Sequence, residues 1–428
     1  MNARTSRMAA AGVGLALALT ACATSTGGSS SGDGGGHGSI KAGPGIDVEN
    51  KTITLGNIAA LTGPAAALSE PGNGGWEVFW QGSNARDELD GWTVVIITRD
   101  SGYQPQQHVQ IFNELKSEVA LIGSFGSPTT KAILPLVERE NILTVPEAFD
   151  SLWGTKPVLA PLSTPYAIDA LNSLGYLTDQ GEKKLKVGAI YQNDEYGADG
   201  LRGYEAAFKE YGFTDVGREP FKAGDTDFTA QVQKLKSAGA EVVFVVALAS
   251  AAGPIVGTSA SMGFTPQFVF LGPAFVENLV TADGSADGQP TPIAKALTGT
   301  IVTSFAAPWG DESVPGMEQM LLDVEKFAPE QNPSVYFTVG YAQSKMVQAV
   351  LKNAIADGDL SREGIVNAKN SLGEVPLEGL VPSTTYDGEV GPPSRASLIE
   401  RIDPEVVGFL TTVEAGYLSE PAKTFDIE

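Results

Sequence analysis

Cysteine and histidine are almost missing from this 428-residue chain. Cys22 is its one cysteine, which excludes an intramolecular disulfide, and its two histidines are His37 and His108. Zinc sites draw mainly on cysteine and histidine, so the chain has too few ligands for such a site, and we expect no bound metal. His108 is the one imidazole base outside the N-terminal region, and we expect it to be a surface residue of an amphipathic helix. The composition therefore disfavours zinc chemistry and a serine nucleophile activated by histidine.

Positive charge, long apolar runs and nucleotide-binding signatures are also scarce. Lys and Arg number 28 against 51 Asp and Glu, a formal net charge of −23 that would repel nucleic acids and anionic membrane surfaces. No apolar run of about 20 residues follows the N-terminal region, so we expect no membrane-spanning helix. The chain also lacks GxxxxGK(S/T) and GxSxG, and it has no GxGxxG between a strand and a helix. We therefore expect no cofactor and no nucleic-acid partner.

The N-terminal residues have the pattern of an export signal. Arg4 and Arg7 precede the apolar run 8–19, which is long enough for a signal peptide and too short for a membrane span. The sequence Leu19-Thr20-Ala21-Cys22 resembles a bacterial lipobox, so we expect residues 1–21 to be a lipoprotein signal peptide and Cys22 to be lipidated. The alternative is an ordinary secretory signal with a chance cysteine. Residues 22–47 are rich in Gly and Ser and predict a flexible tether.

The composition becomes globular from about Val48, and the roughly 380 residues that remain are too many for one small core. Apolar runs alternate with patterns of helical spacing in two successive series, which predicts an α/β fold with two parallel sheets. The expected strands cover residues 52–61, 92–100, 119–122, 142–146, 185–191, 241–248, 267–272 and 299–305. The expected helices cover residues 74–89, 105–116, 200–211, 228–238, 251–262, 335–357 and 361–371, with one more after Ser127. The C-terminal tail is expected to be irregular.

The stretch 121–140, LIGSFGSPTTKAILPLVERE, predicts a strand, a loop of small residues and a helix. Gly123 and Gly126 permit unusual backbone angles, and Ser127 precedes a proline that suits a first helical turn. Ser127 is a candidate N-cap beside free backbone N–H groups and the positive end of the helix dipole. This combination favours an anion or a polar oxygen of a ligand. The alternative is a satisfied cap that binds nothing.

Six motifs occur in an order that is similar to one known family. They are LTGPAA (61–66), RDSGYQPQQ (99–107), IGSFGSPTTKAILPLVERENILTVPEA (122–148), AIYQNDEYGADGL (189–201), AGDTDFTAQVQKLKSAGAEVVFV (223–245) and FLGPAF (270–275). The chain resembles the periplasmic binding proteins of the Leu/Ile/Val-binding type, the receptors of branched-chain amino-acid and related ABC importers. The resemblance implies a type I periplasmic binding protein, with two Rossmann-like lobes joined by three crossovers and a ligand in the cleft. One lobe would contain residues 48–168 and 304–378, and the other residues 169–303 and 379–428.

The resemblance also implies where a ligand would be held. Ser127 and the N-terminus of the following helix would hold a ligand carboxylate, with the backbone amides of Thr129 and Thr130 as helpers. The other contacts carried over from the family are Ala148 and Asp150 in the next loop, Tyr196 in the second lobe, and Ala65 to Leu68 in the wall of the first loop. The alternative for Tyr196 is an aromatic residue that packs beside the hinge.

The late-strand motif departs from the family pattern. Amino-acid receptors of the family place an acidic residue after this Gly-Pro, where it pairs with the ligand ammonium, but here Ala274 and Phe275 follow. Asp150 could supply the missing charge from the opposite lobe, or it could be a helix cap beside Ser151. The pocket is therefore expected to prefer a more apolar or aromatic ligand.

The resemblance and the lipobox together imply a lipid-anchored receptor on the extracytoplasmic face of the membrane. It would deliver a small organic solute, which is amino-acid-like, an organic acid or an amide, to the permease and ATPase subunits of an ABC importer by cleft closure. The family implies no enzymatic activity. The alternatives are a ligand-binding sensor on the same fold and a lipid-anchored hydrolase that uses Ser127.

Overall fold

The structure is a computed structural model that describes residues 40–181, 185–388 and 391–428. The expected signal peptide, Cys22 and most of the expected tether lie outside the described residues. The end of that tether is structured: β1 (Lys41–Ala42) pairs with β12 (Asp359–Leu360), and β2 (Ile46–Asp47) pairs with β3 (Thr52–Ala59). The globular part therefore begins earlier than the composition indicated, because backbone pairing holds a segment that has few apolar side chains.

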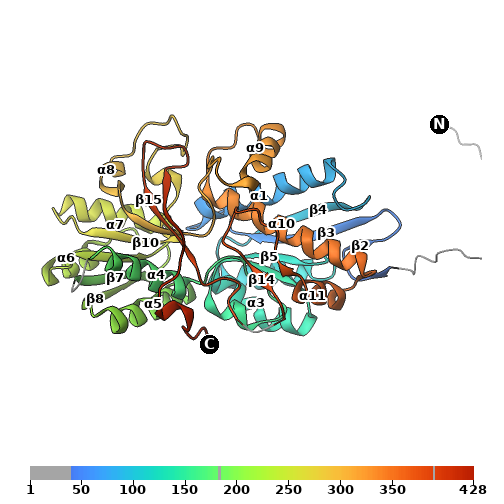
Figure 1. The fold of residues 1–428 in the computed structure, drawn as a ribbon, viewed down its shortest axis with the longest axis horizontal. Helices are drawn as coiled ribbons and strands as arrows, with labels where there is room; N and C mark the ends of the chain where they lie inside the picture. The colour runs from blue at the N-terminus through green and yellow to red at the C-terminus, as the bar shows by residue number, and fades with distance from the viewer. Residues whose placement is uncertain (1–39, 182–184, 389–390) are drawn as a thin grey trace, which may run out of the picture. The chain divides into compact units, whose positions relative to one another are not determined.

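The first lobe is built on a five-stranded sheet of β2, β3, β4 (Thr93–Asp100), β5 (Ile122–Phe125) and β6 (Thr144–Glu147). β3 pairs in parallel with β4 and β5, and β5 pairs in parallel with β6. Apolar residues of α2 (Pro105–Leu115) and α3 (Ser127–Glu140) pack on the face that carries Ile58. Asn57, which precedes Ile58 on β3, points to the opposite face of the sheet and contacts α1 (Ala66–Ala85). Figure 1 shows α10 (Val335–Ala356) beside α1, and α11 (Arg362–Asn370) follows it.

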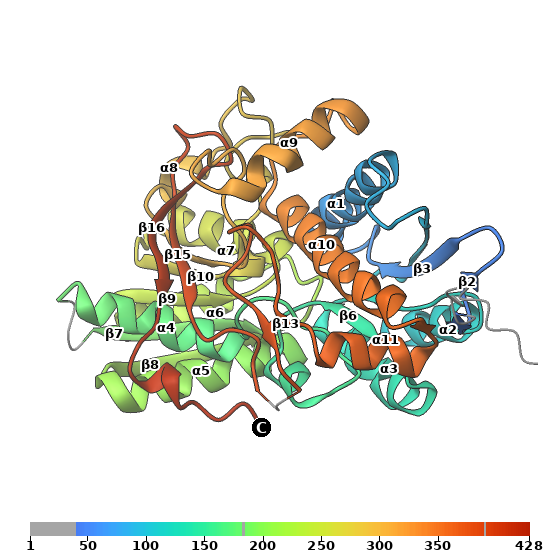
Figure 2. The same cartoon turned by 45° about the vertical axis from the view of Figure 1, so that its right-hand side comes forward.

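The second lobe is built on a seven-stranded sheet in the order β16-β15-β11-β10-β9-β7-β8. Its parallel strands are β7 (Lys186–Gln192), β8 (Thr214–Phe221), β9 (Val242–Val246), β10 (Gln267–Leu271) and β11 (Ile301–Ser304). β15 (Ser397–Ile402) and β16 (Leu410–Tyr417) add an antiparallel edge. Figure 2 shows the helices of this lobe around the sheet: α4 (Tyr166–Asp179), α5 (Glu195–Tyr211), α6 (Thr229–Ala238), α7 (Ala249–Ser261) and α8 (Ala294–Leu297).

Three connections in the described chain join the two sheets. They follow β6, β11 and the short hairpin of β13 (Gly373–Glu374) and β14 (Thr385–Tyr386). The second connection leads to α9 (Pro315–Phe327), which packs against α1 in the first lobe. This is the two-lobed type I architecture that the sequence predicts, and it sets the carboxyl ends of both sets of parallel strands towards a shared cleft.

Several elements differ from the sequence-based expectation. The expected irregular C-terminal tail is wrong, because β15 and β16 pair with β11 and with each other. α1 begins at Ala66, although Pro71 and three glycines follow within its first turns. The helices α4 and α9 and the strand β8 were not predicted. In each case contacts with distant parts of the chain outweigh a weak local signal.

The expectation that His108 is a surface residue is also wrong. The imidazole is fully buried, and its Nε2 lies 2.9 Å from Ser124 Oγ on β5. Burial lowers the pKa of His108 to about 3, so the ring is neutral at physiological pH. His108 thus belongs to the packing of α2 on the first sheet.

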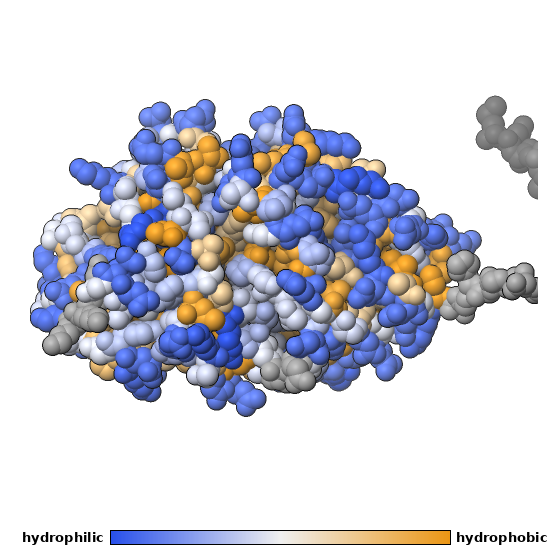
Figure 3. All heavy atoms as spheres, in the orientation of Figure 1, coloured by the Kyte–Doolittle hydropathy of each residue, from blue (hydrophilic) through white to orange (hydrophobic). Residues whose placement is uncertain are grey.

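Hydrophilic residues cover most of the face shown in Figure 3, where hydrophobic residues form only small groups. Within the described ranges, no helix combines the length and the apolar character needed to cross a bilayer. The apolar residues lie instead in the cores of the lobes and in the region between them.

Candidate functional site

A small cavity of about 30 Å³ lies where the carboxyl ends of the two sets of strands meet. The first lobe contributes the segments after β5 and β6 and parts of α1 and α10, and the second lobe contributes Tyr196, Leu248 and Pro273. The aromatic residues of its wall are Tyr103, Phe125, Phe149, Tyr166, Tyr196, Phe305 and Tyr336.

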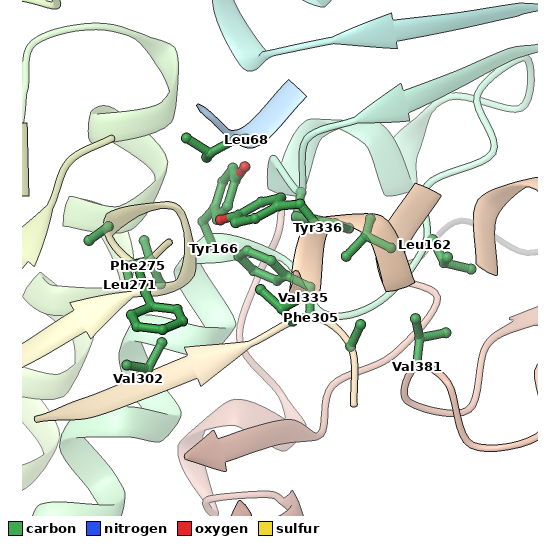
Figure 4. Packing of buried hydrophobic residues seen from close by; sticks show 14 of the residues in the cluster. Leu68, Leu162, Tyr166, Leu271, Phe275, Val302, Phe305, Val335, Tyr336 and Val381 are labelled. Atoms are coloured by element: carbon green, nitrogen blue, oxygen red, sulfur yellow. The ribbon is translucent and has the colours of Figure 1, made fainter. Parts of the chain in front are cut away.

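The aromatic rings of the wall pack against one another. Phe149 and Phe305 are stacked with their centroids 4.1 Å apart, and Tyr166 meets Tyr196 edge to face at 4.7 Å. In Figure 4, Tyr166, Phe305 and Tyr336 form one group close to Leu68 of α1. Such a wall favours an apolar or flat ligand body, because aromatic faces supply a large contact area with little loss of side-chain entropy.

Ser127 lies at the start of α3, on the cavity wall. The N-cap is Gly126 and not Ser127, which corrects the sequence interpretation. Gly126 has a φ of 93°, and a Cβ atom there would lie 2.6 Å from the Tyr103 ring, so the turn requires glycine. The Ser127 hydroxyl is therefore not used as a cap. It is buried, and it has no hydrogen-bond partner among the described residues.

Two further polar side chains line the cavity. The Gln343 amide is occupied, since its Nε2 donates to Pro146 O at 3.2 Å and its Oε1 accepts from Trp76 Nε1 at 3.1 Å. Glu147 is the last residue of β6; its side-chain Oε1 has no hydrogen-bond partner among the described residues, and burial raises its pKa to about 8. The described residues of the wall include no lysine and no arginine. The site thus offers hydroxyl groups, a neutral carboxyl group and the N-terminus of α3, but no cation.

The family profile described as periplasmic binding protein matches residues 52–404 of this chain. The chain belongs to the periplasmic binding protein family. An amino acid binding protein of Pseudomonas aeruginosa is 24% identical over 319 residues, which is 71% of this chain and 79% of that protein. A Leu/Ile/Val/Thr-binding protein of Salmonella typhimurium is 24% identical over 323 residues, 72% of this chain and 82% of that protein. These relatives confirm the branched-chain amino-acid type that the sequence motifs indicated.

Solved structures agree with this family. A fatty acid ABC transporter substrate-binding protein from Thermomonospora curvata superposes with a TM-score of 0.84 at 27% identity, covering 91% of this chain and 97% of that chain. A branched chain amino acid ABC transporter protein from Thermus thermophilus, with bound valine, has a TM-score of 0.76 at 18% identity. The superposition covers 87% of this chain and 98% of that chain. The second similarity shows the fold alone.

Some residues expected to contact ligand do line the cavity of this periplasmic binding protein. Ser127, Ala148, Tyr196 and Leu68 are all in its wall. The Tyr196 hydroxyl donates to Ala247 O at 3.2 Å, so its ring rather than its oxygen faces the cavity space. Thr129 is not in the wall, because its hydroxyl donates back to Gly126 O at 2.9 Å, and Thr130 bonds Ser124 Oγ at 2.7 Å. The Thr130 backbone amide also donates to Gly126 O, at 3.0 Å, so of the two backbone amides only that of Thr129 remains available as a donor.

Three other expected residues lie outside the cavity wall. Asp150 caps the short helix η1 (Ser151–Thr155) by accepting from Leu152 N at 3.0 Å, as its alternative interpretation proposed. It faces a separate hollow with Asp199, and burial together with this carboxyl group raises the pKa of Asp150 to about 7. Ala274 and Phe275 are buried behind the wall, and Figure 4 shows Phe275 with Leu271 and Val302, away from Tyr166. Of the Gly-Pro motif, only Pro273 reaches the cavity.

Sequence reasoning missed several residues of the wall. Glu147 belongs to the motif at residues 122–148, and a glutamate at the end of a buried strand could have indicated a site residue. Tyr166 is the first residue of α4, Phe305 directly follows β11, and Tyr336 and Gln343 lie on α10. These four have no local feature that would distinguish them from packing residues.

Proposed function

We propose that this protein is a lipid-anchored receptor on the extracytoplasmic face of the membrane that delivers a small organic solute to the permease and ATPase subunits of an ABC importer. Membership of the periplasmic binding protein family supports solute binding, and the similar protein from Thermomonospora curvata is an ABC transporter substrate-binding protein. The lipobox pattern that ends at Cys22 supports the anchor.

The ligand class follows from the two ends of the cavity. The free Ser127 hydroxyl and the first turn of α3 form a donor-rich end, to which the Thr129 amide could add. The stacked rings of Phe149 and Phe305, with Ala148 and Tyr196, form the apolar part. The observation that carries the proposal is this unpartnered hydroxyl in an aromatic cavity. It suits an organic acid, an amide or an amino-acid-like solute with an apolar body.

Contacts between the lobes support closure around the ligand. Ser250 Oγ of the second lobe donates to Pro64 O of the first at 2.8 Å, and Lys131 Nζ lies 3.7 Å from Glu195 Oε1. The Tyr103 hydroxyl lies 3.5 Å from Asp194 Oδ2. A ligand that touches both lobes would shift the population towards this closed arrangement.

The hydrolase alternative has little support from the site. A serine nucleophile needs a base within hydrogen-bond reach, but His108 bonds Ser124 and does not line the cavity. A receptor therefore agrees better with the position of Ser127 than a hydrolase does.

Replacing Ser127 with alanine tests the receptor function. We expect Ser127→Ala to weaken binding of 4-methylpentanoate by about 1–3 kcal/mol, the usual effect of removing a buried hydrogen-bond partner. Isothermal titration calorimetry would measure this change, and Ser261→Ala on the exposed end of α7 is the matched control. Equal affinities for the wild type and Ser127→Ala would contradict a role for this hydroxyl. If the wild type hydrolyses an ester of the same acid and Ser127→Ala does not, the hydrolase alternative would be favoured.

A further inference from the structure

A row of polar side chains runs from the cavity into the first lobe, beneath α1. Asn57 on β3 pairs in register with Gly123 on β5, and Phe125 pairs with Glu147 on β6. Residues paired across strands, and residues two apart along a strand, point to the same face of a sheet. Asn57 and Glu147 therefore both point towards α1 and α10, and Glu147 is also part of the cavity wall.

Two oxygen atoms in this row are buried without a partner. Asn57 Oδ1 and Glu147 Oε1 make no hydrogen bond with any described residue. Both lie against Gly123, where a Cβ atom would be 2.6 Å from the first and 2.9 Å from the second. Glycine at this position leaves room for the two oxygens to approach each other. Two buried acceptors side by side are unfavourable unless one of them carries a proton.

Hydrogen bonds fix which way the Asn57 amide points. Asn73 Nδ2 on α1 donates to Glu77 Oε1 at 2.8 Å. Asn73 Oδ1 accepts from Asn57 Nδ2 at 3.0 Å, and Thr98 Oγ1 donates to the same oxygen at 3.0 Å. Reversing both amides would set the Asn73 oxygen against the Glu77 carboxylate. The exposed Glu77 thus orients the row so that an amide oxygen, and not an amide N–H, lies beside Glu147.

We infer that Glu147 serves the site as a neutral carboxylic acid whose proton is donated to Asn57 Oδ1, and that the ligand is a carboxylic acid or an amide without an α-ammonium group. This inference rests on the proposed function of the same cavity. An ammonium group would require the ionised form of Glu147, which would lose the proton that Asn57 Oδ1 needs. The unpartnered hydroxyls of Ser127 and Tyr336 are donors that suit a carboxylate or an amide oxygen instead.

The electrostatic surroundings of Glu147 agree with a neutral group. Its raised pKa, about 8, is caused by burial alone. The titratable groups on the elements around it are Glu77 on α1, Tyr336 on α10, Tyr166 on α4, Tyr196 on α5 and Tyr103 after β4. Burial raises the pKa of each of these tyrosines, so they are neutral as well. No described lysine or arginine lines the cavity that could hold Glu147 ionised.

Calorimetry with matched ligands tests the inference. The probes are 4-methylpentanoate, its amide, and leucine, which differs from the acid by the α-ammonium group. Between about pH 6 and about pH 9.5, wild-type affinity for the acid should fall about tenfold per pH unit once Glu147 ionises, while affinity for the amide falls less. Glu147→Gln should bind the acid at every pH as the wild type does at low pH, because the Gln amide can donate to Asn57. Glu400→Gln, which removes a buried carboxyl outside the cavity whose pKa is also raised to about 8, should keep the wild-type slope.

Two results would overturn the inference. One is wild-type affinity for the acid that does not change with pH. The other is tighter binding of leucine than of the acid, lost in Glu147→Gln, which would make Glu147 the partner of a ligand ammonium. Failure of every probe to bind the wild type would count against the proposed ligand class. In that case infrared spectroscopy of the ligand-free protein still tests whether Glu147 is protonated. The band of protonated carboxyl groups should be weaker in Glu147→Gln than in the wild type, and an unchanged band would refute the neutral acid.

Discussion

Replacing Gly340 with alanine tests the crossing of α1 and α10, which forms one wall of the cavity. Gly72 and Gly340 both line the cavity, and a Cβ atom on Gly340 would lie 1.9 Å from Gly72 O. An ordinary carbon–oxygen contact is about 3.3 Å or longer, so the two helices would have to separate by more than about 1 Å. Overpacking of this kind costs about 1–3 kcal/mol, which exceeds the gain of about 0.5–1 kcal/mol from replacing a helical glycine by alanine. We therefore expect Gly340→Ala to unfold more easily and to bind ligand more weakly.

Gly74→Ala on the same helix pair is the matched control for this prediction. The nearest atoms to a Cβ there, in Gln331 and Phe337, are 3.5 Å away, so the alanine fits without moving the helices. We expect this variant to gain about 0.5–1 kcal/mol of stability. Urea unfolding followed by circular dichroism gives the midpoint and the slope for each variant, and calorimetry gives the affinity. If Gly340→Ala is as stable as Gly74→Ala and binds ligand normally, the close contact of the two helices is wrong.

Three further predictions concern the anchor, closure and pH. Cys22→Ser should move the protein from the membrane fraction to the soluble extracytoplasmic fraction, because the lipid acceptor is lost; unchanged membrane retention in fractionation contradicts the anchor. Saturating ligand should reduce the radius of gyration measured by small-angle X-ray scattering, since the lobes make contacts across the cavity mouth; an unchanged radius argues against closure. Burial raises the pKa of Glu400 to about 8 from 4.5, so the folded state keeps a proton that the unfolded state releases, and stability falls as pH rises through this window. Glu400→Gln should therefore lose less stability between about pH 5 and about pH 8 than the wild type, by up to about 4 kcal/mol in urea titrations, and parallel curves would refute the shift.

The parts of the fold that were predicted correctly have strong local patterns. The run around β9 is continuously apolar and is buried on both faces of its sheet, so periodicity identifies it without tertiary information. The C-terminal hairpin was missed because β16 is mostly exposed, and its residues 410–417 show no clear alternation. The start of α1 was missed because Pro71 and nearby glycines lower helix propensity, whereas these glycines permit the contact with α10.

The carried-over site residues divide in the same way. Ser127 lies two residues after β5, and Ala148 directly follows the neighbouring parallel strand β6, so local sequence places both at the same edge of the sheet and hence at the cavity. Ala274 and Phe275 also follow a strand, but the short helix η2 (Gly272–Ala274) turns their side chains into the second lobe. After a strand ends, a shift of one or two residues decides whether a side chain faces the ligand or the core. That shift depends on how the loop packs against the rest of the lobe.

The sequence by itself determined most of the alternating strands and helices of the two parallel sheets, the two-lobed fold and the position of Ser127 at the start of a helix. These features depend on hydrophobic period, glycine and proline placement, and the topology rules of parallel sheets, all of which act over short stretches of chain. Only the tertiary structure decided the chemistry of the cavity. Most of the cavity wall comes from residues before 200, and Tyr336 joins it because α10 returns to cross α1. Glu147 lies beside Asn57 because β5, the strand between β3 and β6, has a glycine at Gly123 that leaves room for both side chains. Burial at that meeting point, and not the identity of the residue, makes a glutamate neutral.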